Sequence, residues 1–251
     1  MTILTLLVKA SNASQLRQVG DLLSAEFEEL DVEAKVLGNP INKWVQVSLS
    51  GEDETIATNY INKKIGTCPT TLENAKNQSV LNGYISKVDQ NKQELKVDVG
   101  IFEPKAIQAS VPLPRLQAQL AESKEVAFKK IVEAFSLAEG LPLSVKVIGE
   151  EAEGLGAELS AQQVEKLQGW QQSLLDRLII LSASRDTVDS VLERTRLDRD
   201  VIDVEALGFF EHALTCKLGT DAAGVIPRIG GYLKHSVLVV FSAKKSVSFL
   251  G

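Results

Sequence analysis

Apolar and polar positions follow distinct periods along the chain, and in residues 1–68 they predict the order strand, helix, strand, strand, helix. The predicted strands are Thr2–Lys9, Val32–Leu37 and Trp44–Leu49. The helix after the first strand keeps its apolar residues at helical spacing, and either Asn12 or Ser14 can cap it. A second helix starts at Ser50. We expect a partial ferredoxin-like domain that lacks a final strand, followed by a polar linker over Cys68–Gln78.

Residues 79–160 carry five short β-rich runs, with a helical pattern between the third and the fourth. The runs are Leu81–Val88, Glu94–Gly100, Ala106–Leu113, Leu143–Ile148 and Gly156–Ser160. The helical pattern covers Pro114–Leu120 and Lys124–Leu137, which is longer than a minimal barrel of this kind carries. Five strands interrupted at this point are what an OB-type β-barrel needs. We therefore predict a five-stranded OB-type barrel with a helical insertion.

Residues 161–251 begin with a helix that Ser160 can cap, and then show the order strand, helix, strand, strand, helix, strand. The predicted elements are Arg177–Ala183, Asp186–Leu197, Val201–Leu207, Phe209–Leu218, Thr220–Leu233 and Ser236–Ser242. This is the complete split-βαβ order of a ferredoxin-like domain. The predicted fold class is α+β, with two ferredoxin-like (split βαβ) segments flanking the OB-type barrel.

Three of the predicted strands are apolar on both faces, namely Ile3–Val8, Leu178–Leu181 and Val237–Phe241. A split-βαβ domain has helices on only one side of its sheet, so the second face must also be covered. We expect these sheets to pack against another domain or against another subunit, which would make a homo-oligomer.

The central runs also carry short motifs in a fixed order. They are Gly83 with Ile85, then Val97-Asp98-Val99-Gly100, then Val111-Pro112-Leu113, and finally Leu159-Ser160. In this order they resemble the RNA-binding OB domain that is repeated in the bacterial ribosomal protein that holds mRNA. The resemblance covers about a third of the chain and implies an RNA-binding barrel. The sequence departs from that family in Glu94–Val99, which lacks the aromatic pair that usually stacks on bases.

The third segment carries three further motifs, at Asp200–Asp203, Gly208–His212 and Cys216–Gly224. With these motifs it resembles a family of uncharacterised archaeal proteins found in methanogens and their relatives. The resemblance would extend over most of the chain and implies a cytoplasmic archaeal protein, without an established activity.

The formal net charge of −6 argues against a protein that coats nucleic acid indiscriminately. Residues 161–251 hold 11 basic and 11 acidic side chains and are neutral, so any RNA contact must be a local patch. No stretch is long and apolar enough to cross a bilayer, and no signal peptide pattern is present, so we expect a cytoplasmic protein without a membrane partner.

No catalytic or metal-binding motif stands out, and we expect a protein that is not an enzyme and binds no cofactor. Cys68 and Cys216 are the only cysteines and lie in different segments, which argues against a disulfide framework or a thiol metal cluster. His212 shares a strand face with apolar residues and is better explained as a buried structural histidine, and His235 is expected at a helix end. An RNA-modifying enzyme or an accessory subunit of one stays open as an alternative.

The turn Gly219–Gly224 leads from a strand into a helix and has two interpretations. Thr220 or Asp221 can act as a simple helix cap, and the backbone N–H groups could instead receive a phosphate of RNA. The phosphate interpretation is supported by the neighbouring Lys217 and Arg228.

We predict a non-catalytic RNA-binding protein, associated with the ribosome or with another structured RNA, and we expect no DNA partner. Single-stranded RNA sites combine stacking rings with basic side chains. The candidates on the barrel are Tyr84, Lys87, Lys92, Lys96, Phe102 and Lys105, and those in the third segment are Lys217 and Arg228. The alternative is a protein-interaction or assembly module that forms oligomers through its apolar sheets.

Overall fold

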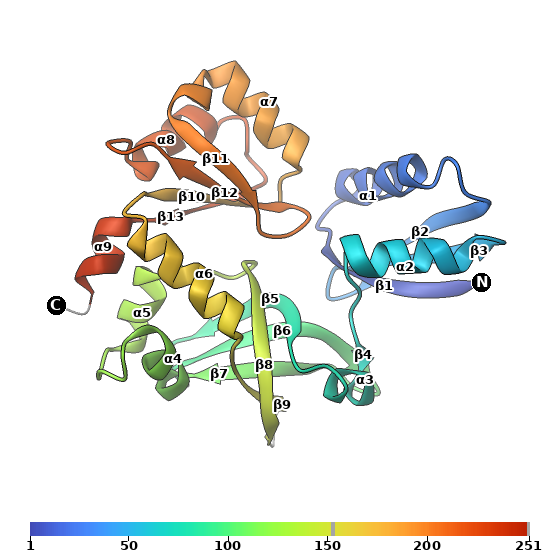
Figure 1. Ribbon diagram of the computed structural model, residues 1–251, viewed down its shortest axis with the longest axis horizontal. Helices are drawn as coiled ribbons and strands as arrows, with labels where there is room; N and C mark the ends of the chain where they lie inside the picture. The colour runs from blue at the N-terminus through green and yellow to red at the C-terminus, as the bar shows by residue number, and fades with distance from the viewer. Residues whose placement is uncertain (152–153, 250–251) are drawn as a thin grey trace. The chain divides into compact units, whose positions relative to one another are not determined.

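The computed structural model describes residues 1–151 and 154–249, and they form two compact units (Figure 1). Unit 1 comprises Met1–Ala75 and Gly100–Ala106, and unit 2 comprises Lys76–Val99 and Ile107–Gly251. Both units mix helices with antiparallel sheets, so the protein is α+β.

Unit 1 contains a three-stranded antiparallel sheet in the order β1-β3-β2, and its first two helices follow β1 and β3, as predicted. Its elements are β1 (Thr2–Lys9), α1 (Ala13–Glu26), β2 (Val32–Ile41), β3 (Trp44–Gly51), α2 (Glu54–Lys64), β4 (Thr70–Thr71) and α3 (Leu72–Lys76). Asn12 caps α1, because its side-chain oxygen accepts a hydrogen bond of 2.9 Å from the Gln15 backbone N–H. The second helix begins later than predicted, at Glu54, with Asp53 and not Ser50 at its N-cap position.

The segment after α2 is structured, so the prediction of a linker over Cys68–Gln78 is wrong. The backbone N–H of Leu7 donates to the Gly66 carbonyl at 2.9 Å, and that of Cys68 donates to the Thr5 carbonyl at 2.8 Å. This segment therefore pairs with part of the β1 edge. Further along, β4 pairs in parallel with the end of β6, at Thr70 and Ile101.

The central strands form a closed five-stranded barrel, as the five β-rich runs predicted. The strands are β5 (Leu81–Asp89), β6 (Glu94–Glu103), β7 (Ile107–Pro112), β8 (Pro142–Glu151) and β9 (Gly154–Leu159). Their order is β6-β5-β8-β9-β7, and a pairing between β6 and β7 closes the ring. The β7–β9 pair is parallel, whereas β5 pairs in antiparallel fashion with β6 and β8. Helices α4 (Leu113–Leu120) and α5 (Phe128–Ala134) lie between β7 and β8, where the insertion was predicted.

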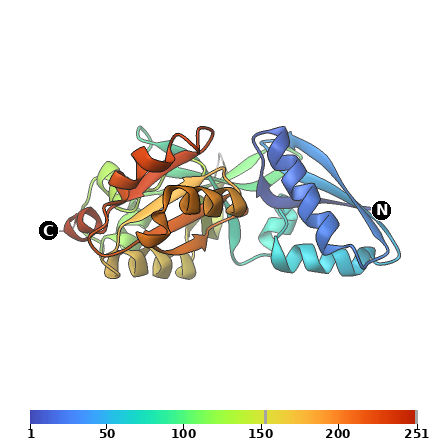
Figure 2. The ribbon, with the colours of Figure 1, turned by 90° about the horizontal axis from the view of Figure 1, so that it is seen from above.

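The C-terminal part of unit 2 is a four-stranded antiparallel sheet in the order β11-β12-β10-β13. Its elements are α6 (Ala161–Gln172), β10 (Arg177–Leu181), α7 (Arg185–Thr195), the 3₁₀ turn η1 (Leu197–Arg199), β11 (Val201–Ala206), β12 (Glu211–Cys216), α8 (Ala222–Ile229), β13 (Val237–Phe241) and α9 (Ala243–Ser248). Helices α7 and α8 lie side by side on one face (Figures 1 and 2). The apolar core between them and the sheet includes Leu178, Ile180, Val191, Leu214 and Val225.

The second face of this C-terminal sheet is covered by helices of the same unit. The Trp170 ring on α6 packs edge-on against Phe241, with 5.5 Å between the ring centroids. The Ser136 hydroxyl donates to the Val240 carbonyl at 2.8 Å. The expectation that this apolar face is covered is confirmed, and the cover comes from the chain itself. In unit 1, by contrast, Ile3 on β1 is 56% exposed.

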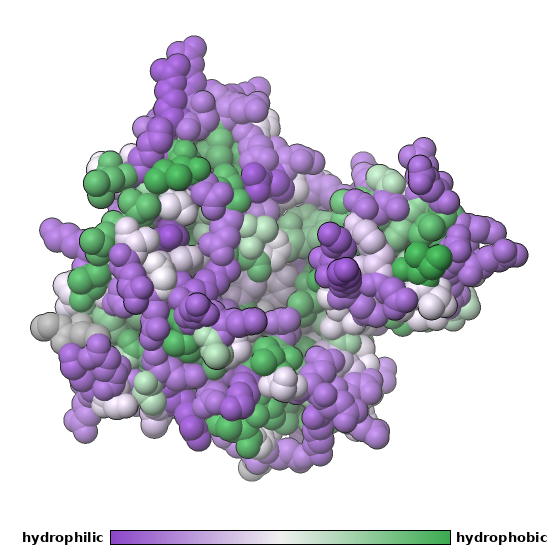
Figure 3. Space-filling model, viewed as in Figure 1, coloured by the Kyte–Doolittle hydropathy of each residue, from purple (hydrophilic) through white to green (hydrophobic). Residues whose placement is uncertain are grey.

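None of the helices within residues 1–151 and 154–249 is long and apolar enough to cross a bilayer. On the face shown in Figure 3, hydrophobic residues form several separate groups among hydrophilic ones.

Candidate nucleic-acid interface

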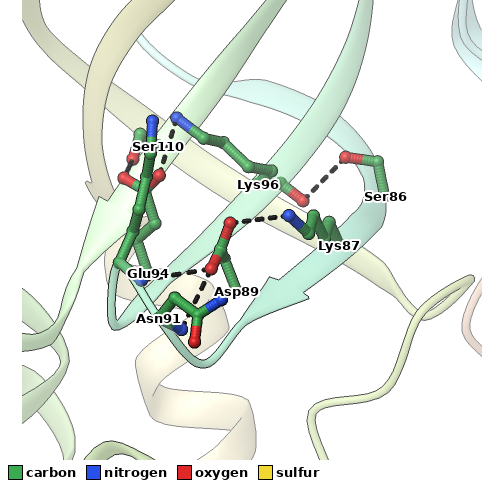
Figure 4. A network of polar contacts seen from close by, with 8 residues as sticks. Ser86, Lys87, Asp89, Asn91, Glu94, Lys96 and Ser110 are labelled. Carbon is green, nitrogen blue, oxygen red and sulfur yellow. Dashed lines mark hydrogen bonds and ion pairs between the residues drawn. The ribbon is translucent and has the colours of Figure 1, made fainter.

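The turn between β5 and β6 is held by Asp89, a carboxylate with several donors (Figure 4). One oxygen accepts hydrogen bonds of 3.1 Å from the backbone N–H groups of Asn91 and Lys92, and the other lies 2.7 Å from the Lys87 ammonium. The Lys87 hydrogen bond, followed by those from the backbone, lowers the pKa of Asp89 to about 2. Lys92 is exposed in this turn, and Lys87 forms an ion pair with Asp89.

A second carboxylate, Glu94 on β6, pairs with one side chain on the same strand and one on the neighbouring strand β7 (Figure 4). It accepts a hydrogen bond from the Ser110 hydroxyl on β7, and its other oxygen lies 2.9 Å from the Lys96 ammonium. Glu94 and Ser110 are both buried. Because a buried carboxylate needs such partners, the Lys96 ammonium stabilises the barrel.

We call Lys87, Asp89, Glu94, Lys96 and Ser110 the hairpin cluster. Two of the three lysines predicted on these strands, Lys87 and Lys96, lie in it as partners of carboxylates. The third, Lys92, follows Asp89 in the turn. The structure thus brings the three lysines together on one hairpin, where Lys87 and Lys92 are exposed and Lys96 is half-buried.

Tyr84 lies on β5 with only 3% of its surface exposed. Its hydroxyl donates to a Glu211 carboxylate oxygen at 3.3 Å, and the Phe210 backbone N–H donates to the same oxygen at 3.2 Å. The loop here fits closely, because a Cβ atom on Gly208 would lie 2.4 Å from that oxygen. Tyr84 therefore joins the barrel to the C-terminal sheet, and its buried ring offers no face to a base.

Phe102 and Lys105 belong to unit 1, whereas the hairpin cluster belongs to unit 2. Phe102 lies near the end of β6 and is half-buried, and Lys105 is exposed in the connection to β7. The six barrel candidates are therefore divided between the two units.

Lys217 and Arg228 come together at Asp200, which follows η1. The Arg228 guanidinium lies 2.8 Å from the Asp200 carboxylate and also donates to the Thr195 carbonyl at 2.9 Å. The backbone N–H of Lys217 donates to the Asp200 carbonyl at 2.8 Å. The backbone of one candidate and the side chain of the other thus contact the same residue, which precedes both in the chain.

The turn before α8 is a helix cap. Asp221 occupies the N-cap position and accepts a hydrogen bond of 2.9 Å from the Ala223 backbone N–H. Of the two residues considered for this cap, the structure selects Asp221. Its negative charge at the helix N-terminus disfavours a phosphate at the same place.

Around Asp200 the structure gathers further cations that the sequence reasoning did not select. Arg194, Arg196 and Arg199 lie at the end of α7 and in η1, and all three are exposed. The Arg194 guanidinium lies over the Tyr232 ring, 5.5 Å from its centroid. The close spacing of three arginines was a visible signal in the sequence, but nothing there indicated the ring or Arg228 beside them. We call Arg194, Arg196, Arg199, Lys217, Arg228 and Tyr232 the C-terminal corner.

His212 and Cys216 lie on β12 and are buried, as predicted for His212. One His212 ring nitrogen lies 3.1 Å from the Ala183 carbonyl, and burial lowers the pKa of this imidazole below 6.5. Burial raises the pKa of the Cys216 thiol to about 11, so it stays protonated and unreactive at neutral pH. His235 does not lie at a helix end, because α8 already ends at Ile229.

Within the described ranges, 1–151 and 154–249, no three His, Cys, Asp or Glu side chains are grouped so that they could hold a metal ion.

Three family models match consecutive parts of the chain. They are the DUF2110 N-terminal domain at residues 2–71, the DUF2110 central domain at residues 75–171 and the DUF2110 C-terminal domain at residues 175–241. The chain belongs to the DUF2110 family. The barrel and α6 of this DUF2110 protein thus fall in the central domain, and the C-terminal corner falls in the C-terminal domain. A comparison with curated proteins finds no match.

Proposed function

We propose that this DUF2110 chain is a non-catalytic protein that binds single-stranded RNA, with a ribosomal or other structured RNA as its cytoplasmic target. The observation that carries the proposal is the strand order of the closed barrel, in which the third and fifth strands, β7 and β9, pair in parallel. We infer an OB-type barrel from this order. Barrels of this type bind oligonucleotides through their second and third strands and through the loop between the first two.

The strand order of the C-terminal sheet also supports the proposal of an RNA-binding protein. The order β11-β12-β10-β13, with a helix after the first and after the third strand of the segment, is consistent with a ferredoxin-like domain. The order β1-β3-β2 in unit 1 is consistent with a partial version. Both folds also host other activities, so the site must be tested directly.

The assembly alternative has less support than it had from the sequence. Helix α6 and Ser136 contact the second face and the edge of the C-terminal sheet, so that sheet needs no second subunit as cover. The exposed Ile3 leaves the sheet of unit 1 as the remaining candidate for self-association.

Fluorescence anisotropy of a short labelled single-stranded RNA, titrated at two salt concentrations, tests the proposal. We expect micromolar binding that weakens with salt, since phosphate contacts release counterions. Lys87→Glu with Lys92→Glu should weaken binding more than the charge-matched control, Lys63→Glu with Lys64→Glu, on α2. Lys96 is left intact because its ammonium pairs with Glu94. Absence of binding at low salt would overturn the proposal, and equal effects of the two variants would exclude the hairpin as a contact.

A further inference from the structure

The cations of the C-terminal corner differ from those of the hairpin cluster in their partners. Among the residues that the structure describes, no carboxylate pairs with the side chains of Arg194, Arg196, Arg199 or Lys217. Only Arg228 is held by an acid, Asp200. Exposed cations that no carboxylate contacts directly can attract an anion, although Glu193 and Asp198 are exposed beside them in the chain.

Hydrogen bonds, an ion pair and a ring contact join the segments that carry these residues. Arg228 bonds to the carbonyl of Thr195, which lies between Arg194 and Arg196 in the chain. Tyr232 follows one turn after Arg228, and its ring lies under the Arg194 guanidinium. Lys217 is tied to Asp200, the ion-pair partner of Arg228. The hydrogen bonds and the ring contact thus link α7, the end of η1, the end of β12 and α8.

We propose that the C-terminal corner is a phosphate-binding and base-stacking surface for single-stranded RNA. This inference rests on the proposed function and adds a surface that the barrel order does not indicate. Arg196, Arg199 and Lys217 contact backbone phosphates, and Tyr232, which is 50% exposed, stacks on a base with Arg194 behind its ring. Sites for single strands combine these two features, a basic groove and a ring that accepts any base.

The exposed ring favours RNA over an acidic protein segment as the ligand. An acidic peptide would be satisfied by the cations alone, whereas a nucleic acid base also uses the face of an aromatic ring. The sheet of the C-terminal segment cannot serve this purpose, because α6 packs against its other face. The RNA contact of this segment therefore lies on the side of the C-terminal sheet that α7 and α8 cover.

The test is the same anisotropy titration with the full chain and the variant Arg196→Gly, Arg199→Ala, Lys217→Ala. Glycine suits position 196, because its φ of 56° lies in the left-handed region, so the change removes charge without backbone strain. We expect affinity to fall about tenfold. The slope of log affinity against log salt concentration should become shallower by about 2, because each of the three lost phosphate contacts on a single strand contributes about 0.7. The matched control, Lys63→Ala, Lys64→Ala, Lys130→Ala, removes three exposed lysines elsewhere and should change affinity less than twofold.

Equal loss in the corner variant and in the control would overturn this inference while leaving RNA binding itself intact. No binding by the unaltered protein would instead overturn the proposed function. Thermal unfolding of each variant checks that the fold is retained.

A second variant separates stacking from charge. Tyr232→Leu should weaken RNA binding about fivefold or more, within the range known for loss of a stacking ring, and should leave binding of inorganic polyphosphate unchanged. If RNA and polyphosphate weakened alike, or not at all, the stacking role of Tyr232 would be wrong. If labelled polyglutamate bound the corner as tightly as the RNA, the partner would be an acidic protein and the assignment to RNA would fail.

Discussion

The hairpin cluster and the C-terminal corner both carry basic side chains that suit RNA, but their charges are used differently. In the hairpin cluster each ammonium meets a carboxylate, at 2.7 Å for Lys87 with Asp89 and at 2.9 Å for Lys96 with Glu94. In the corner, Arg228 alone pairs with an acid among the described residues. A cation that already has a carboxylate partner gains less from a phosphate, because that partner must be displaced or repels the ligand. Similar residue types can thus stabilise a fold in one place and be available to a ligand in another.

The largest difference between the two regions should appear in stability. Glu94→Ala leaves the Lys96 ammonium and the buried Ser110 hydroxyl without their partner, so we expect the free energy of unfolding to fall by about 2–3 kcal/mol. Arg199→Ala, on the exposed corner, should change it by less than about 0.5 kcal/mol. Urea unfolding followed by circular dichroism measures both. Similar losses would show that the corner is as structural as the hairpin cluster.

The next effect separates pH-dependent stability from the charge of the corner. Burial lowers the pKa of His212 in the folded state, so the unfolded chain binds the extra proton first as pH falls. Stability is therefore fully present above about pH 6.5 and decreases below it, by at most about 1.4 kcal/mol per pH unit, until the lowered pKa is passed.

His212→Leu should remove this part of the pH dependence, as measured by urea unfolding at pH 7.5 and pH 5.5. Over the same range the arginines of the corner keep their charge, so RNA affinity of the folded protein should stay nearly constant. A pH dependence of stability that is identical in the variant and in the unaltered chain would exclude His212 as its source.

A smaller effect tests whether the ion pair of Lys87 with Asp89 limits the RNA affinity of the hairpin cluster. Asp89→Asn removes the negative charge beside Lys87 but keeps a side-chain oxygen for the backbone N–H groups of Asn91 and Lys92. We expect RNA affinity at moderate salt to rise about threefold, since one cation becomes available to a phosphate. Asp21→Asn, at an exposed position on α1, is the matched control and should leave affinity unchanged. Unchanged affinity in Asp89→Asn would mean that the hairpin does not contact RNA even when its lysine is released.

The smallest expected change concerns the Asp89 carboxyl itself. The pKa of Asp89 is about 2, and the hydrogen bond from Lys87 is the largest cause of this lowering. Lys87→Ala should therefore move this pKa up toward the ordinary value of 3.8, which a carbon-detected NMR titration follows directly. Lys105→Ala is a control outside the hairpin. A pKa that stayed near 2 would assign the shift to the backbone donors alone.

Much of the fold could be predicted because its signals are local. Strand and helix periods placed the five strands of the barrel and the strands and helices of the two flanking sheets, and side chains at the expected caps of α1, α6 and α8 bond the first turn. The segment after Cys68 was missed, because its short strand exists only through pairing with β6, a strand about 30 residues later. Polar composition there indicated a linker, and tertiary pairing overrode it.

The candidate site was less predictable, because it depends on contacts between residues far apart in the chain. Tyr84 had the composition of a stacking residue, but its hydroxyl meets Glu211, 127 residues away in the chain, and this contact buries its ring. Nothing near Lys96 in sequence shows that Glu94 is also bound by Ser110 on another strand. Only part of the C-terminal corner was predicted. Lys217 and Arg228 were selected from the sequence, but the arginines at the end of α7 and in η1, near which Arg228 bonds, were not.

The sequence by itself determined most of the order of strands and helices, the three segments, the acidic balance and the lack of a recognisable catalytic motif, because period, capping and composition are properties of neighbouring residues. Only the tertiary structure decided which ring is buried, which sheet face is covered and which cations keep a free charge. Those outcomes depend on contacts between residues far apart in the chain, and the energy of a charge depends on the partners and the solvent that the fold places around it.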